Sequence, residues 1–190
     1  AYALAKGIGY PMFLVLAKKL CLPYSVLLAL LQAVGAWLFV RALSVRWKNP
    51  YGQTLLYLLL LFSPISLTQL VTQRLYRMAI VPGMVLVVFS GMIGLTLRKE
   101  LPLKKQLPWA VLTGMALAFF WQIREDSVWI LPFIAVMTVW NVGYVILALH
   151  KKRTGRQLLL QCFILLLPIL LLFCDNITIS AINQVHYGVF

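Results

Sequence analysis

Apolar residues fill this chain in long blocks that short basic stretches separate. After residue 20 there are six such blocks of about 17–23 residues, the length that an α-helix needs to cross the roughly 30 Å hydrocarbon core of a bilayer. The pattern therefore predicts six membrane-spanning helices. Their expected ranges are Tyr24–Val40, Tyr51–Val71, Met78–Leu97, Leu107–Ile123, Ser127–Leu149 and Gln157–Phe173.

An earlier apolar block, Ile8–Leu20, is shorter and contains Pro11. As a helix it would reach only about 20 Å, which is too short to span. We expect it to form an interfacial or re-entrant helix with Lys18 and Lys19 at its end. The predicted fold is therefore all-α: a polytopic membrane bundle of about six transmembrane helices plus one short N-terminal interfacial helix.

Composition supports a membrane protein. The chain is 63% hydrophobic and 11% charged, whereas soluble domains average about 45–50% apolar and about 25% charged residues. The formal net charge of +13 would suggest nucleic-acid binding in a soluble protein. Here the basic residues lie between apolar blocks, where membrane topology and lipid headgroups explain them, so we expect no nucleic-acid partner. The three cysteines lack metal-ligand spacing and are interpreted as small apolar filler.

The basic residues also predict an orientation. By parity, the segments after the first, third and fifth spans lie on one side and hold eleven of the 17 Lys and Arg residues: Arg41, Arg46, Lys48, Arg98, Lys99, Lys104, Lys105, Lys151, Lys152, Arg153 and Arg156. The positive-inside rule places this side in the cytoplasm. Every acidic residue except Glu100 then lies on the outer side.

The outer stretch "WQIREDSVW" holds two of the four acidic residues, Glu125 and Asp126, next to Arg124. A carboxylate held near the headgroups is partly desolvated and needs a partner for its charged form. Glu125 and Asp126 are therefore candidates for a catalytic base or a sugar-binding group. The alternative is a tight polar turn whose acids are neutralised by local arginine.

A second outer stretch, "QRLYR", places Arg74 and Arg77 three residues apart, on one face if the segment is helical. Two guanidinium groups on one face suit a phosphate or diphosphate, although both could instead reach lipid phosphates. Lys6, in "KGIGYP", is a further candidate phosphate contact, with Arg124 assisting. The alternative to a phosphate-binding role for that stretch is an ordinary loop-to-helix junction.

These motifs resemble the membrane glycosyltransferases of the C-type fold. The shared features are "KGIGYP" entering a short helix, a span ending in Arg on the inner side, and "QRLYR" at the outer end of the next span. In that family a Lys-Pro-Pro-Leu-like motif ends the first outer loop, and Lys6 and Pro11 match it. The resemblance implies a sugar donor linked to a polyprenyl phosphate, transfer of the sugar on the outer side, and contact of Lys6 with the carrier phosphate.

The chain departs from that family at both ends. The family's catalytic acid lies in the first outer loop, which here would precede Ala1, as would the first span, and its soluble domain would follow Phe190. We therefore expect residues 1–190 to form a single transmembrane bundle that is a fragment of a longer protein. The roles of Asp126 and Glu125 come from position and charge alone.

Three functions remain open. The first is a glycosyltransferase-like enzyme of the cell envelope, in a plasma membrane such as the bacterial inner membrane, whose partners are membrane lipids and a lipid-linked sugar donor. The second is a transporter or flippase of an anionic lipid or solute, which the concentration of charges at span ends disfavours. The third is a non-catalytic membrane scaffold. The sequence indicates no cofactor; a divalent cation is compatible with the carboxylates but is not indicated.

Overall fold

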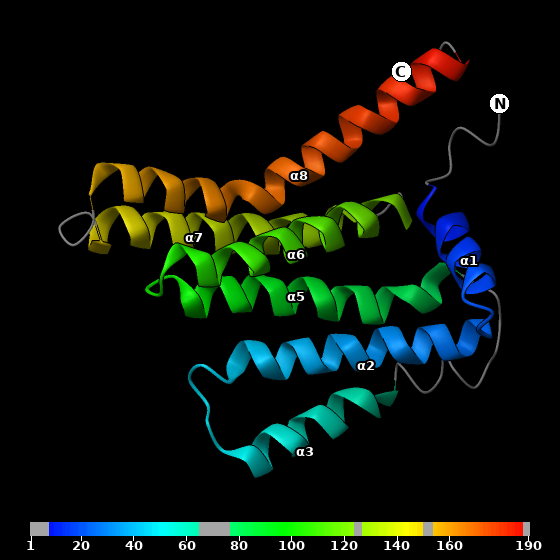
Figure 1. The fold of residues 1–190 in the computed structure, drawn as a ribbon, viewed down its shortest axis with the longest axis horizontal. Helices are drawn as coiled ribbons and strands as arrows, with labels where there is room; N and C mark the ends of the chain where they lie inside the picture. Colours follow the sequence, from blue (N-terminus) through cyan, green and yellow to red (C-terminus); the bar gives the residue numbers. More distant parts are fainter. Residues whose placement is uncertain (1–7, 65–76, 124–126, 150–153, 188–190) are drawn as a thin grey trace.

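The structure is a computed structural model that describes residues 8–64, 77–123, 127–149 and 154–187. Within these ranges all regular secondary structure is helical (Figure 1). The elements are α1 (Gly9–Lys19), α2 (Tyr24–Leu43), α3 (Pro50–Leu61), the 3₁₀ helix η1 (Arg77–Ile80), α5 (Val81–Arg98), α6 (Leu103–Ile123), the 3₁₀ helix η2 (Ser127–Ile130), α7 (Leu131–Leu149) and α8 (Gly155–Tyr187).

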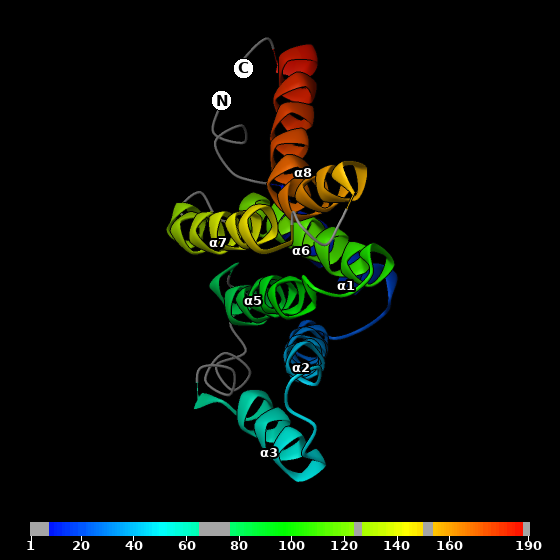
Figure 2. The ribbon, with the colours of Figure 1, turned by 90° about the vertical axis from the view of Figure 1, so that its left-hand side faces the viewer.

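The long helices lie side by side in a layered bundle. The order is α3, α2, α5, then α6 and α7, and finally α8 (Figures 1 and 2). Helix α5 packs against both α2 and α6, and α6 packs in turn against α8. The α2–α3 and α5–α6 connections and the start of α8 lie at one end of the bundle, and α1 lies at the other (Figure 1). We call these the basic end and the α1 end.

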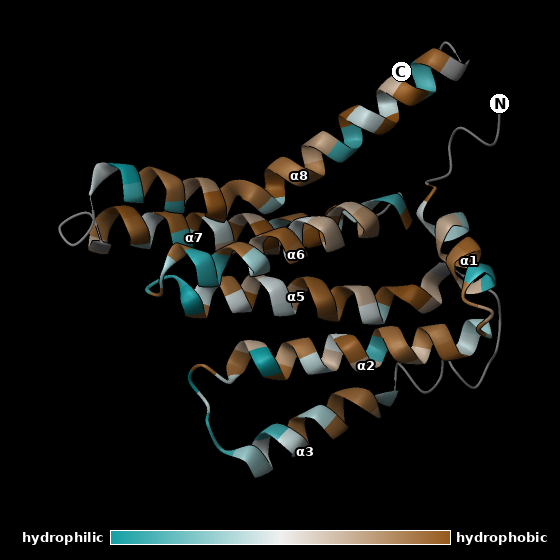
Figure 3. Ribbon diagram, in the orientation of Figure 1, coloured by the Kyte–Doolittle hydropathy of each residue, from teal (hydrophilic) through white to brown (hydrophobic). Residues whose placement is uncertain are grey.

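Four stretches are long and apolar enough to cross a membrane: Tyr24–Leu43, Met78–Arg98, Ser127–Ala148 and Gly155–Val185. Figure 3 shows apolar residues along most of their length. This fits an integral membrane protein and supports four of the six predicted spans. Helix α6 has 21 residues, of which Lys104 and Lys105 lie in its first turn, and α3 has 12 described residues, too few to span. The count of about six therefore stays a prediction for those two segments.

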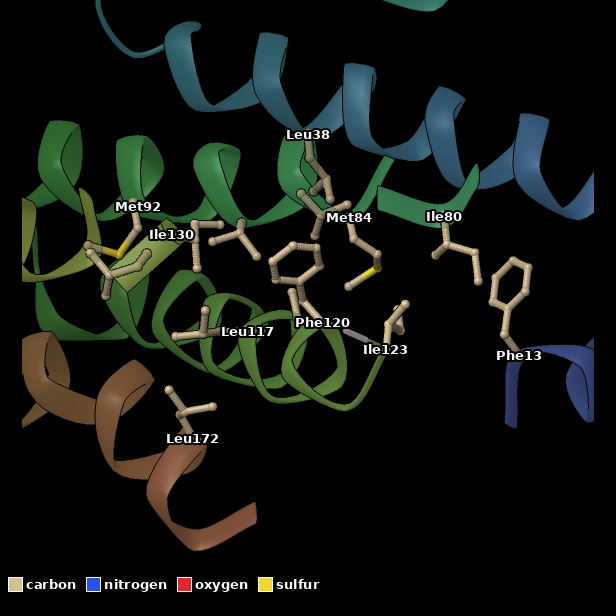
Figure 4. Close-up of a cluster of buried hydrophobic side chains, with 14 of the residues drawn as sticks. Phe13, Leu38, Ile80, Met84, Met92, Leu117, Phe120, Ile123, Ile130 and Leu172 are labelled. Carbon is tan, nitrogen blue, oxygen red and sulfur yellow. The ribbon is translucent and has the colours of Figure 1, made fainter. Parts of the chain in front are cut away.

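The buried core lies where α5 and α6 meet, between α2 on one side and α8 on the other. Phe120, Leu117, Met92 and Met84 are among its side chains (Figure 4). Gly91 permits the close approach of α5 and α6, because a Cβ atom there would collide with the Thr113 side chain and lie 3.2 Å from its Cα. Small residues at helix contacts are the usual basis of close packing in membranes.

Helix α1 has 11 residues and lies across the ends of the long helices (Figure 1). Its predicted interfacial location stays a prediction. Its end is a Schellman motif: the Cys21 N–H donates to the Lys18 carbonyl and the Leu22 N–H to the Ala17 carbonyl, both at 3.1 Å. Cys21 adopts a φ of 52° and is exposed. The sequence suggested only small apolar filler for Cys21; in the structure this residue forms the left-handed part of a helix cap.

Helix α8 is much longer than the predicted span Gln157–Phe173, since it continues to Tyr187. The polar residues after Phe173 do not end it, because their side chains bond within the helix: Asn176 Nδ2 donates to the Leu172 carbonyl and Thr178 Oγ1 to the Cys174 carbonyl. Pro168 lies inside the helix, and the helix bends away from the bundle in its central part (Figure 1).

Candidate functional site

The predicted outer site falls almost entirely outside the described residues. This holds for Lys6, Arg74, Arg124, Glu125 and Asp126. Arg77 begins η1, but its side chain also lies outside the described part. The roles assigned to these residues therefore stay predictions, and only the residues next to them in the sequence can be placed.

Those neighbouring residues come together at the α1 end. Gly9, which follows Lys6 by three residues, packs on the α6 backbone, where a Cβ atom would lie 2.8 Å from the Gln122 carbonyl carbon. Ile80 at the end of η1 and Ile123 directly before Arg124 are 0% and 2% exposed. Both belong to the same buried cluster as Phe13 of α1 (Figure 4). The start of α1 therefore packs on the end of α6, and η1, which contacts α5 and α2, lies at the same end of the bundle.

Helix α8 joins this end through its acidic residue. Gln122 Nε2 donates a hydrogen bond to Asp175 Oδ2 at 2.7 Å. Asp175 is half-buried, so the amide partly replaces the water that its carboxylate loses on burial. Asp175 lies two residues beyond the predicted span Gln157–Phe173 and inside α8, which continues to Tyr187. The contact brings a carboxylate to the end of α6, one residue before Ile123.

An apolar groove follows α1 at this end. It has a volume of about 430 Å³. Its lining, within the described part of the chain, consists of one charged residue, Lys19, and of Ile8, Pro11, Met12, Phe13, Val15, Leu16 and Phe119. Met12, Val15 and Leu16 are each about half exposed. A groove of this composition suits a hydrocarbon chain, with the Lys19 ammonium available to a nearby anionic headgroup.

The basic end contains a buried guanidinium group. Arg98, 8% exposed, donates from Nη1 to the Ala42 carbonyl at 3.2 Å and from Nη2 to the Arg41 carbonyl at 2.9 Å. Its Cζ also lies 4.3 Å from the centroid of a Trp109 ring. The cation thus faces the carbonyl end of α2, where the helix dipole favours positive charge. Arg98 was expected in a basic loop, but it is the last residue of α5 and a packing element.

Next to Arg98, a lysine and a glutamate share one tyrosine. Lys99 Nζ lies 3.7 Å from the centroid of the Tyr144 ring, and the Tyr144 hydroxyl donates to Glu100 Oε1 at 2.5 Å. Burial lowers the pKa of Lys99 below its ordinary value; the charge of Glu100 raises this pKa and that of Arg46 lowers it further. The Lys99 ammonium is therefore a cation that an added anion would stabilise.

Buried amides form a polar layer beneath these charges. Gln106 Nε2 donates to the Leu101 carbonyl at 2.8 Å, and Gln161 Nε2 donates to the Lys99 carbonyl at 2.5 Å. Asn141 Nδ2 donates to Thr96 Oγ1 at 2.8 Å. These bonds fix the α5–α6 turn against α7 and α8, which holds Lys99 and Glu100 in place.

Sequence reasoning missed this polar layer. Asn141 and Gln161 stand out in the sequence as lone amides inside apolar runs. Because polar groups inside membrane spans face the bundle interior, these two residues could have indicated a buried polar layer. Their partners could not be inferred, because Thr96, Lys99 and Gln106 lie at least 45 residues away along the chain in each case.

Within the described residues, no three His, Cys, Asp or Glu side chains gather to hold a metal ion. The chain matches no protein-family model, no curated protein and no solved structure.

Proposed function

We propose that this chain belongs to a glycosyltransferase-like membrane protein that binds a polyprenyl-phosphate-linked sugar at the α1 end of the bundle. The proposal retains six spans, with α6 and the segment beginning at α3 completing the four apolar helices. It places the protein in a plasma membrane, such as the bacterial inner membrane, with the basic end in the cytoplasm. The α1 end would then face outward.

One observation carries the proposal: the residues flanking the three predicted site segments lie at the same end of the bundle (Figure 4). Gly9, Ile80 and Ile123 all lie at the α1 end, two of them in one buried cluster and the third against the backbone of α6. Their sequence neighbours Lys6, Arg77 and Arg124 supply the cations that a phosphate would need. The groove along α1 offers an apolar surface for the polyprenyl chain.

In the proposed reaction the acidic residues accept a proton and the basic residues stabilise the leaving phosphate. The acceptor hydroxyl attacks the anomeric carbon of the sugar, and its proton passes to Asp126 or Glu125. The bond between the anomeric carbon and the phosphate oxygen breaks, and the polyprenyl phosphate leaves with the bonding electrons. Lys6, Arg74 and Arg77, assisted by Arg124, stabilise the negative charge that develops on the phosphate.

Transfer of a radiolabelled sugar from polyprenyl phosphate, measured in membranes that contain the full gene product, tests this function. We expect Arg77→Ala and Asp126→Asn each to reduce transfer by at least about 100-fold, the usual effect of removing a group that acts in the transition state. Lys48→Ala, at the basic end, is the matched control and should retain full transfer. Unchanged transfer in both site variants would refute the site assignment.

The two other functions make different predictions for the same variants. A transporter or flippase would move labelled donor across sealed vesicles without transferring the sugar. A scaffold would keep its role after Arg74→Ala, Arg77→Ala and Asp126→Asn together. Neither function is favoured by a specific contact among the described residues.

A further inference from the structure

A polar pocket of about 350 Å³ opens at the basic end of the bundle, away from the proposed sugar site. The α2–α3 connection contributes Val45 and Arg46, and α5 with the turn after it contributes Thr96, Leu97, Lys99, Glu100 and Leu101. Among the residues that the structure describes, two cations and one carboxylate thus line the pocket. A pocket with a net positive charge suits a singly charged phosphate diester.

Two of the charges in this pocket, Lys99 and Glu100, are held in place by aromatic residues of α7. Lys99 Nζ stacks on Tyr144 at 3.7 Å and lies 6.0 Å from the centroid of the Trp140 ring. Glu100 accepts a hydrogen bond from the same Tyr144. Arg46 is exposed, yet it lies close enough to Lys99 to lower the pKa of that ammonium group. An anion between Arg46 and Lys99 would relieve their repulsion.

An apolar groove on α7 adjoins this pocket. It also measures about 350 Å³ and is lined by Val139, Trp140, Gly143, Tyr144, Leu147 and Ala148. Its floor is open at Gly143, where a Cβ atom would meet nothing within 4 Å. Tyr144 connects the two cavities, because it lines the groove while its ring and hydroxyl contact Lys99 and Glu100 of the pocket.

We propose that the pocket and the groove together bind one anionic phospholipid. Its phosphate lies between Arg46 and Lys99, and an acyl chain follows the α7 groove past Gly143. Charge complementarity and the junction at Tyr144 favour this ligand over others. A soluble phosphate compound would use only the pocket, whereas a second copy of the chain would cover the groove without needing the cations. The positive-inside rule adds that this end faces the anionic cytoplasmic leaflet.

The test compares lipids of equal chain length on the purified chain in neutral detergent. Native mass spectrometry measures the retention of phosphatidylglycerol against phosphatidylcholine. We expect clear preference for phosphatidylglycerol and a loss of about thirtyfold in its affinity for the double variant Arg46→Gln, Lys99→Gln. Arg46→Gln alone, at an exposed residue whose loss the fold tolerates, should lose about fivefold. The matched control Lys48→Gln, Lys104→Gln removes two charges outside both cavities and should change affinity by about threefold or less.

A substitution at Gly143 tests the role of the apolar groove on α7. Gly143→Leu places a side chain in open space, so folding should persist while phosphatidylglycerol affinity falls about tenfold or more. Unchanged affinity in Gly143→Leu, with full displacement of the lipid by excess glycerol 3-phosphate, would show a free-phosphate site and overturn the proposal. Equal losses in the Arg46–Lys99 and Lys48–Lys104 variants would overturn it too, as diffuse electrostatic attraction. Dissociation of a dimer by Gly143→Leu without loss of lipid would assign the groove to a second copy instead.

Discussion

At the scale of single residues, Arg98 shows how backbone carbonyls and an aromatic ring can surround a buried cation. Its guanidinium group bonds to carbonyls of Arg41 and Ala42 in the last turn of α2, and to the Gly94 carbonyl of its own helix at 3.2 Å. Helix-terminal carbonyls have no partner within the helix, so they need donors. Arg98 supplies these donors and stacks on Trp109 of α6, thereby joining three helices.

We therefore expect Arg98→Lys to destabilise the protein even though it conserves the charge. Lysine cannot present the planar fork that reaches two carbonyls of α2 at once, nor stack in the same way on Trp109. The expected loss is about 1–3 kcal/mol of unfolding free energy, measured by titration with a denaturing detergent. Arg156→Lys, at an exposed position at the start of α8, is the control. An equal effect of both substitutions would show that the contacts of Arg98 contribute little.

At the scale of elements, the hydrophobic runs of the sequence predicted where helices occur more accurately than they predicted where each helix begins and ends. The predicted start of the first span, Tyr24, coincides with the start of α2, and Ile123 ends α6 as predicted. The start of α6 was placed four residues late, at Leu107, because Lys104 and Lys105 were assigned to a loop. Lysines at a helix end keep their ammonium groups in the headgroup region, so charge alone does not end a helix.

The sites were less predictable than the helices, for a physical reason. The anchoring of Gly9 on Gln122 and the contact of Lys99 with Tyr144 join segments far apart along the chain. Periodicity reports which face of a helix is apolar, but not which helix covers that face. The close contact of Gly91 in α5 with Thr113 in α6 could not be predicted for the same reason, because periodicity does not show which helices pack together.

Gly91 and Gly143 form a matched pair for testing these helix contacts. Gly91→Ala should destabilise the protein by about 1–3 kcal/mol, because its Cβ atom would collide with Thr113 and push α5 from α6. Gly143→Ala enters open space and should be neutral or stabilising by up to about 1 kcal/mol, since alanine is the better helix former. Detergent-induced unfolding of both variants measures the difference. Equal stability of the two would contradict the close α5–α6 packing.

At the scale of the whole molecule, both proposed sites depend on which end of the bundle faces which side of the membrane. The α2–α3 and α5–α6 connections lie at the same end (Figure 1), as the parity of the predicted spans requires. Helix α1 and the Gln122–Asp175 contact lie at the opposite end. A sugar site at one end and an anionic-lipid site at the other are consistent with only one orientation, in which the basic end is cytoplasmic.

Cysteine labelling measures this orientation directly. In a background with Cys21→Gly, Cys162→Ala and Cys174→Ser, single cysteines at Lys48 and Lys104 report on the basic end, and one at Lys18 reports on the α1 end. Glycine suits position 21 because the backbone there is left-handed. A membrane-impermeant maleimide added to intact cells should label Lys18→Cys only, and the other two should react after the cells are opened.

The reverse labelling pattern would place the polar pocket outside and the predicted phosphate-binding arginines inside. The pocket would then not face the anionic cytoplasmic leaflet, and the arginines would not face a sugar donor on the outer side, so both proposals would fail. Labelling of Lys48→Cys and Lys104→Cys from opposite sides would instead show that the segment beginning at α3 does not cross the membrane as an odd number of spans, and the six-span topology would fail.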